Sequence, residues 1–149
     1  MNRLTTPQPA RHNSPTTKAQ KLAYLRFQCP DLSVAERFLT DFGLSVALKT
    51  PAMLYMRSGD SEPFCYVAEK AEKSAFVGFG LHVASRDDLV KLSELEEASS
   101  ISQSPHPGGG EMVQLQDPSG FMVDAVFGQE SVPTLTHRPA LNLNYEQKM

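Results

Sequence analysis

The sequence predicts an α+β fold built from two successive βαβββ modules, and three observations support this prediction. Runs with the two-residue alternation of a half-buried strand occur in both halves of the chain. In each half, apolar residues at helical spacing follow the first strand-like run. The opening strands, 22–29 and 76–84, lie roughly fifty residues apart, which is typical of an internal repeat.

The first module is predicted to occupy residues 21–72. Ser33 and Glu36 have the spacing of a capping box, and Gly43 suits the residue after a helix, so a helix is expected between them. Turn-forming residues then separate three short β-like runs. The predicted strands of this module are 22–29, 44–49, 53–57 and 64–68.

The second module, residues 75–128, repeats this order. Ser85 and Asp88 form a second candidate capping box, followed by leucines at three-residue spacing. The turn 117–120 has the composition of a hairpin connection. The predicted strands of this module are 76–84, 101–103, 112–116 and 121–127.

Outside the two modules, residues 1–20 are predicted to be a disordered leader and residues 129–149 an irregular C-terminal extension. Pro7, Pro9 and Pro15 would interrupt the amphipathic helix of a transit peptide, although the leader is basic.

Composition narrows the function classes. A net charge of −3 and a pI near 5.8 provide no clustered basic face for nucleic acid. No apolar run approaches the length of a membrane span. Two cysteines, Cys29 and Cys65, lie in strand-like runs and are predicted to be buried thiols, which fits the reducing cytoplasm.

Two segments carry a resemblance to a known family. Residues 117–124 read DPSGFMVD and residues 22–32 read LAYLRFQCPDL. Both resemble the vicinal-oxygen-chelate superfamily, which includes glyoxalase I, bleomycin-resistance proteins, fosfomycin-resistance enzymes and extradiol dioxygenases. The resemblance spans residues 22–128. Segments 76–85 and 138–142 are similar to the N-terminal half of extradiol dioxygenases, the half that usually lacks the metal.

This resemblance implies that curved mixed sheets form a cup, with the helices outside. It also implies that the usual metal site is altered. The family's ligand positions fall on Tyr24, on or near Gly78, and on Asp124, so one acid remains of three ligands. A lone aspartate binds a divalent ion poorly, so no cofactor is predicted. An Fe, Mn, Zn or Mg ion would need displaced ligands, namely His82 and Asp124 with Glu111 or His106.

Strand alternation predicts which side chains face the cup. The candidate catalytic residues are Tyr24, Arg26, His82 and Asp124. The candidate substrate-binding residues are Gln28, Gly78, Gly80 and Met122. The glycines would leave room for a ligand near His82, whose imidazole could act as a general acid or base.

Each catalytic candidate also has a structural interpretation. Tyr24 could donate to an oxyanion or simply fill space with its ring. His82 could be a hydrogen-bonded strand histidine, and Asp124 could form a salt bridge with Arg26. Arg26 needs an anionic partner in either case.

Three functions remain open. The first is a metal-independent acid/base rearrangement, cyclisation or elimination on an oxygen-rich substrate of aromatic, polyketide or terpenoid type. The second is a divalent-metal-dependent dioxygenase, isomerase or lyase with non-standard ligands. The third is a non-catalytic small-molecule binding protein. Edge strands that need protection favour a homodimer in each case.

Overall fold

The computed structural model describes residues 12–136 and contains two helices and eight strands. The first module comprises β1 (Ala19–Cys29), α1 (Leu32–Phe42), β2 (Ser45–Lys49), β3 (Met53–Arg57) and β4 (Tyr66–Lys70). The second comprises β5 (Ala75–Val83), α2 (Arg86–Ser93), β6 (Ser102–Gln103), β7 (Glu111–Gln116) and β8 (Met122–Phe127). The predicted βαβββ order therefore occurs twice.

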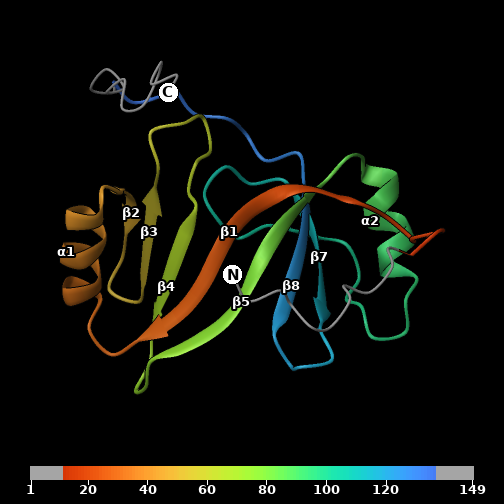
Figure 1. The fold of residues 1–149 in the computed structure, drawn as a ribbon, viewed down its shortest axis with the longest axis horizontal. Helices are drawn as coiled ribbons and strands as arrows, with labels where there is room; N and C mark the ends of the chain where they lie inside the picture. The colour runs from red at the N-terminus through yellow and green to blue at the C-terminus, as the bar shows by residue number, and fades with distance from the viewer. Residues whose placement is uncertain (1–11, 137–149) are drawn as a thin grey trace, which may run out of the picture.

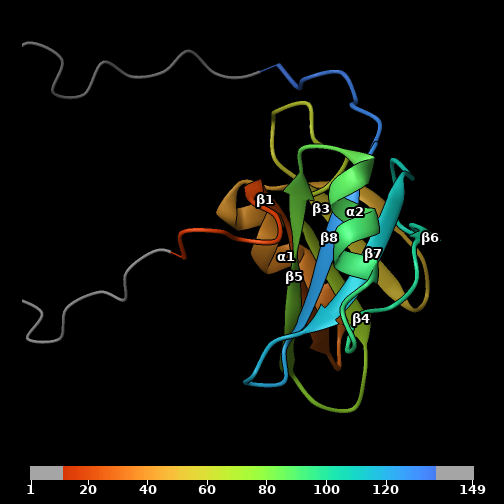
Figure 2. The same cartoon turned by 90° about the vertical axis from the view of Figure 1, so that its right-hand side faces the viewer.

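All eight strands belong to one mixed sheet in the order β2-β3-β4-β1-β5-β8-β7-β6. β1 and β5 form its antiparallel centre, and each has a parallel neighbour, β4 and β8 respectively. The sheet curves into an open trough. β1 and β5 cross the middle of Figure 1, and in Figure 2 they lie on the left while β6 and β7 lie on the right. The α+β fold class is confirmed.

The helices lie outside the trough, at opposite ends of the molecule (Figure 1). α1 packs on β3 and β4 through Leu32 and Leu39, which join Leu54, Met56 and Ala68 in one core cluster. α2 packs on β7 and β8 through Leu89 and Leu92, which join Val83, Val113 and Ala125 in another. A third cluster lines the inside of the trough and consists of Ala23, Tyr24, Tyr55, Phe64, Val67, Met112 and Val126.

The two helix starts differ in how well the sequence predicted them. The Ser85–Asp88 capping box of α2 is present, with both reciprocal hydrogen bonds. The predicted Ser33–Glu36 box of α1 is wrong, because Asp31 is the N-cap residue. Its carboxylate accepts the backbone N–H of Ser33 at 2.8 Å and leaves no capping role for the Ser33 side chain. Gly43 ends α1 with φ of 111°, as predicted.

The C-terminal extension is described as far as residue 136. Residues 129–136 form no helix or strand, but backbone hydrogen bonds hold them against two loops. Val132 and Leu135 donate to Ser61 and Gly59 of the β3–β4 loop, and Glu130 donates to Gly108. The extension therefore covers one end of the trough. The rest of it, 137–149, lies outside the described residues.

At the other terminus, β1 begins at Ala19, one residue before the predicted leader ends, and residues 1–11 lie outside the described part. None of the helices formed between residues 12 and 136 is long and apolar enough to cross a membrane.

Candidate functional site

Asp124 is the centre of a polar cluster inside the trough. Its side chain is fully buried, at 0% exposure. Three side chains donate to it: Tyr24 Oη at 2.9 Å, Arg26 Nη1 at 3.0 and 3.2 Å to the two oxygens, and Gln114 Nε2 at 3.0 Å. The structure thus brings together three of the four candidate catalytic residues, and the salt bridge between Arg26 and Asp124 is present.

Strand register explains this convergence. Tyr24 on β1 is paired with Gly80 on β5, and Gly80 is paired with Asp124 on β8, so the three positions form one row across the sheet centre. Arg26, Gly78 and Met122 form the next row. The sequence placed the second ligand position on or near Gly78; the residue in register with both Tyr24 and Asp124 is Gly80.

The Tyr24 ring fills the space that the small residues leave. A Cβ atom at Gly80 would lie 2.6 Å from Cζ of Tyr24, which is far too close for contact. The Phe64 ring stacks on the Tyr24 ring, with ring centroids 4.7 Å apart. The room predicted beside Gly80 is therefore taken by an aromatic side chain rather than left open.

This environment keeps the Tyr24 phenol protonated. Burial is the largest cause that raises the pKa of Tyr24, and the Asp124 charge and hydrogen bond raise it further. Arg26 opposes this effect without reversing it. Tyr24 is accordingly a hydrogen-bond donor to Asp124 at neutral pH.

His82 lies apart from this cluster, and its partner is a different carboxylate. His82 Nε2 is 3.2 Å from Glu62 Oε2, and Glu62 also contacts the Lys21 ammonium. These three side chains line a small cavity of about 230 Å³ together with Gln129 and Ser131. The predicted pairing of His82 with Asp124 is absent, because the β3–β4 loop brings Glu62 to His82 instead.

The four candidate substrate-binding residues differ in what they contact: backbone, an aromatic ring or a carboxylate. Gly78 packs against the backbone of Met122, since a Cβ there would lie 1.9 Å from the Met122 carbonyl oxygen. Gly80 lies under Tyr24, as described above. The Gln28 side chain is 3.5 Å from the Glu69 carboxylate. Their roles in binding stay predictions.

His106, which the sequence offered as a possible displaced metal ligand, is a neighbour of the cluster. Its Nδ1 lies 3.0 Å from Tyr55 Oη, and its ring meets that of Tyr24 edge-on at 5.4 Å. Burial, and secondarily the Arg26 charge, lower the pKa of His106. The loop 104–110 therefore carries a neutral imidazole over the inner face of the trough.

The donor set does not fit a divalent metal. Tyr24 is protonated, Gly80 supplies no donor, and the Asp124 carboxylate already accepts a guanidinium. The displaced set fails as well: Glu111 pairs with Arg86, and His82 pairs with Glu62. Within residues 12–136, no three His, Cys, Asp or Glu side chains are placed to hold a metal ion.

Gln114 and Glu62 were absent from the predicted site, and His106 was predicted only as a possible displaced metal ligand. Gln114 shares the inward parity of Met112 on β7, so alternation could have included it. Glu62 and His106 lie in loops, where alternation carries no signal, and only the fold brings them to His82 and Tyr55.

Comparison with known proteins agrees with this fold. No family model matches the sequence. The chain is 28% identical over 123 residues to Metapyrocatechase 2 of Cupriavidus necator, a match that covers 80% of this chain and 37% of that protein. The chain thus spans well under half of the length of this relative.

Solved structures give the same result. The Mn(II)-bound glyoxalase from Novosphingobium aromaticivorans superposes with a TM-score of 0.74 at 17% identity, covering 83% of this chain and 44% of that one. Homoprotocatechuate 2,3-dioxygenase from Brevibacterium fuscum, in complex with 3,4-dihydroxyphenylacetate, gives 0.70 at 22% identity, covering 85% and 42%. The enzyme of that name from Arthrobacter globiformis gives 0.70 at 21% identity, covering 83% and 41%.

These neighbours are enzymes, and each is matched over less than half of its length. The curved open sheet of this chain, with its helices outside, superposes on them over 83% to 85% of the chain. The chain therefore has the vicinal-oxygen-chelate fold, as a single module pair that resembles the N-terminal half of extradiol dioxygenases.

Proposed function

We propose that this chain is an enzyme module of the extradiol-dioxygenase type that binds an oxygen-rich aromatic substrate, and that it is the module pair which does not hold the metal. The observation that carries the proposal is the Arg26 guanidinium on the Asp124 carboxylate. The similarity to Metapyrocatechase 2 and to homoprotocatechuate 2,3-dioxygenase supports the substrate class.

The chemistry of the cluster follows from charge. Asp124 is buried with its negative charge compensated by Arg26, so it is a poor base and a poor metal ligand while that pair persists. Arg26 is 21% exposed and uses only Nη1 toward Asp124. A guanidinium has five N–H donors, so Arg26 keeps donors for a phenolate or carboxylate oxygen of a ligand.

The metal part of the proposal is tested by loading the chain with Fe(II) or Mn(II) without oxygen, removing excess ion and measuring bound metal. We expect far less than one ion per chain. The triple variant Tyr24→His/Arg26→Met/Gly80→His is the positive control, because it places two imidazoles and a freed carboxylate in one row and should retain Mn(II). One ion per wild-type chain that Asp124→Asn abolishes would overturn the proposal.

The substrate part is tested with 3,4-dihydroxyphenylacetate, the ligand of the Brevibacterium complex. We expect it to bind the wild-type chain by calorimetry without oxygen uptake. Arg26→Met should bind it at least roughly tenfold more weakly, because a charge-assisted contact is lost. Equal affinity in the two proteins would remove Arg26 from the binding site, and no binding to either would remove this substrate class.

A second function, metal-independent acid/base chemistry, is favoured by one observation, the His82–Glu62 pair beside a cavity. A carboxylate on one imidazole nitrogen holds the ring so that the other can take or return a proton. The cavity of about 230 Å³ suits a small hydroxylated carbonyl compound. In this alternative Glu62 takes the orienting role that the sequence gave to Asp124.

Proton exchange distinguishes this alternative. Dihydroxyacetone in D₂O, followed by NMR, reports removal of a carbon-bound proton. The alternative requires exchange catalysed by the wild-type chain, reduced in His82→Asn and in Glu62→Gln but not in His12→Asn, which lies on the exposed N-terminal segment. Equal exchange in the wild-type chain and in His82→Asn would contradict this alternative.

A further inference from the structure

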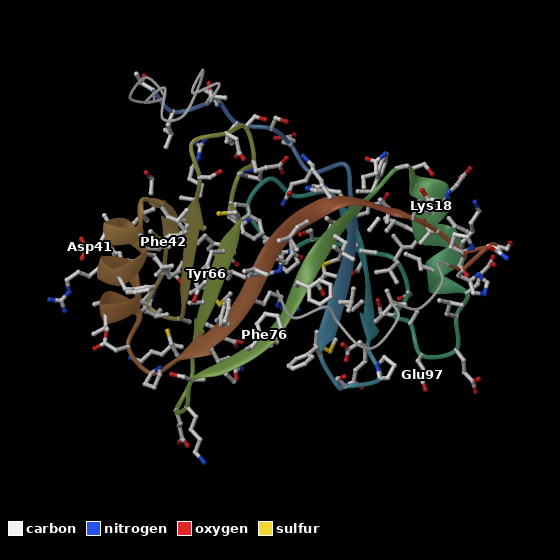
Figure 3. All side chains as sticks on the ribbon, viewed as in Figure 1. Lys18, Asp41, Phe42, Tyr66, Phe76 and Glu97 are labelled. Carbon is white, nitrogen blue, oxygen red and sulfur yellow. The ribbon has the colours of Figure 1, made fainter. Side chains whose placement is uncertain are left out.

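The outer face of the sheet between the two helices carries an aromatic band. We define it as Phe27, Phe38, Phe42, Tyr66, Phe76 and Phe121. Figure 3 shows Phe42, Tyr66 and Phe76 on the same side of the molecule, crossing from α1 to β5. Phe42 and Phe38 on α1 are 77% and 67% exposed, although their neighbours Leu32 and Leu39 are buried.

The four rings of the band that lie on the sheet contact one another. Phe27 stacks on Tyr66 with centroids 4.9 Å apart and meets Phe76 at 5.1 Å, and Phe76 meets Phe121 at 5.1 Å. Between α1 and the end of β1, Phe38 and Cys29 line an apolar cavity of about 430 Å³. Phe38 therefore lies beside the end of β1, the strand that carries Phe27.

The exposed area of the band is a large part of what one partner buries in a stable interface. With about 200 Å² for each aromatic side chain, the band leaves roughly 500 Å² of apolar surface in water. This is near the upper end of the largest patches on monomeric proteins, about 300–600 Å². A stable interface buries about 800 Å² on each partner with an apolar aromatic centre, so the band supplies most of such a centre.

The sheet edges, from which the sequence predicted a dimer, are poorly suited to pairing. β6 has two residues, and β2 has five with a register shift between Val46 and Leu48. Short and irregular edges resist addition of another strand. A dimer of this chain must therefore use another surface.

We infer that a second copy of this chain covers the aromatic band, so that two chains associate face to face about a twofold axis. An isologous contact places the same band on both partners, and aromatic rings pack well on aromatic rings. The inner face, with Asp124 and His82, stays outside this contact because it lies on the opposite side of the sheet.

Light scattering after gel filtration, at roughly 50 micromolar chain, tests this inference. We expect a dimer for the wild type and a monomer for Phe38→Ser/Phe76→Ser, with the dimer dissociation constant raised at least roughly a hundredfold. Leu48→Ser on β2 is the matched control, since it removes an exposed apolar side chain outside the band. It should leave the dimer intact.

Cys29 provides a second measurement that does not depend on variant folding. Its thiol lines the cavity beside Phe38, so alkylation of Cys29 in Cys65→Ser should slow as chain concentration rises. A wild-type monomer, a dimer lost in Leu48→Ser but kept in Phe38→Ser/Phe76→Ser, or alkylation independent of concentration would each overturn the inference.

Discussion

The Arg26 guanidinium contacts both carboxylate oxygens of Asp124, at 3.2 Å to Oδ1 and 3.0 Å to Oδ2. Arg26 lies on β1 and Asp124 on β8, the two strands that flank β5. The two residues are 98 positions apart in the chain. The contact therefore joins the first strand of one module to the last strand of the other. It places a charge-compensated ion pair on the inner face of the sheet.

Replacement of Arg26 by Met is expected to lower the free energy of unfolding by about 3 kcal/mol, because it leaves a fully buried carboxylate without its cation. Urea unfolding followed by circular dichroism measures this change. Arg37→Met on the exposed side of α1 is the control and should change stability by less than about 0.5 kcal/mol. Arg26→Met/Asp124→Leu should recover part of the lost free energy of unfolding. A double variant less stable than Arg26→Met would contradict this account.

Tyr24 should make the stability of the chain fall at high pH. Burial and Asp124 raise the pKa of Tyr24 above its ordinary 10.0, so the folded state holds the phenolic proton more tightly than the unfolded state. This stabilisation is complete below pH 10 and is lost as the pH rises above it. Unfolding free energies measured from pH 8 to 11.5 should fall less steeply in Tyr24→Phe. Parallel slopes in both proteins would exclude Tyr24 as a source.

Gly80→Ala tests the packing of the Tyr24 ring. The added methyl group would lie 2.6 Å from the ring, and overpacking of this kind costs about 2 kcal/mol. In a Tyr24→Leu background the same substitution should cost less than about 1 kcal/mol, because the ring is gone. Thermal and urea unfolding of the four proteins gives the coupling. An equal cost in both backgrounds would mean that backbone flexibility, not the ring, requires glycine.

His106 should make the fold sensitive to mild acid. Burial and Arg26 lower the pKa of His106 below its ordinary 6.5, so the unfolded state binds this proton more readily. The stability that the neutral ring provides is present above pH 6.5 and is lost as the pH falls through the folded-state pKa. His106→Gln, which keeps a partner for Tyr55, should lose less stability than wild type between pH 7.5 and 5.5. An NMR titration of His106 with its midpoint above 6.5 would reverse the expected sign.

Much of the local structure could be predicted from the sequence because it depends on short-range patterns. Alternation along 22–29 placed Tyr24 and Arg26 on one face of a strand, and the structure has them there. The Ser85–Asp88 spacing set the start of α2, and Gly43 set the end of α1. The start of α1 was wrong because two capping candidates, Asp31 and Ser33, lie two residues apart and the pattern does not rank them.

The family resemblance placed Asp124 at the same site as Tyr24, and a salt bridge between Asp124 and Arg26 was one of the two interpretations left open. The resemblance could not set distances, because these depend on the register of three strands that are distant in sequence. The same limit applies to cavities. Small residues on a strand predicted space at Gly80, but the neighbouring strand supplied the ring that fills it.

The sequence by itself determined the repeated βαβββ order, since strand alternation, helical spacing and turn residues are all short-range patterns in the chain. Only the tertiary structure decided that His82 contacts Glu62 rather than Asp124 and that His106 contacts the Tyr55 hydroxyl. It also decided that side chains of the aromatic band are exposed. Loops and sheet curvature set these contacts, and both arise from packing between segments that periodicity along one segment does not encode.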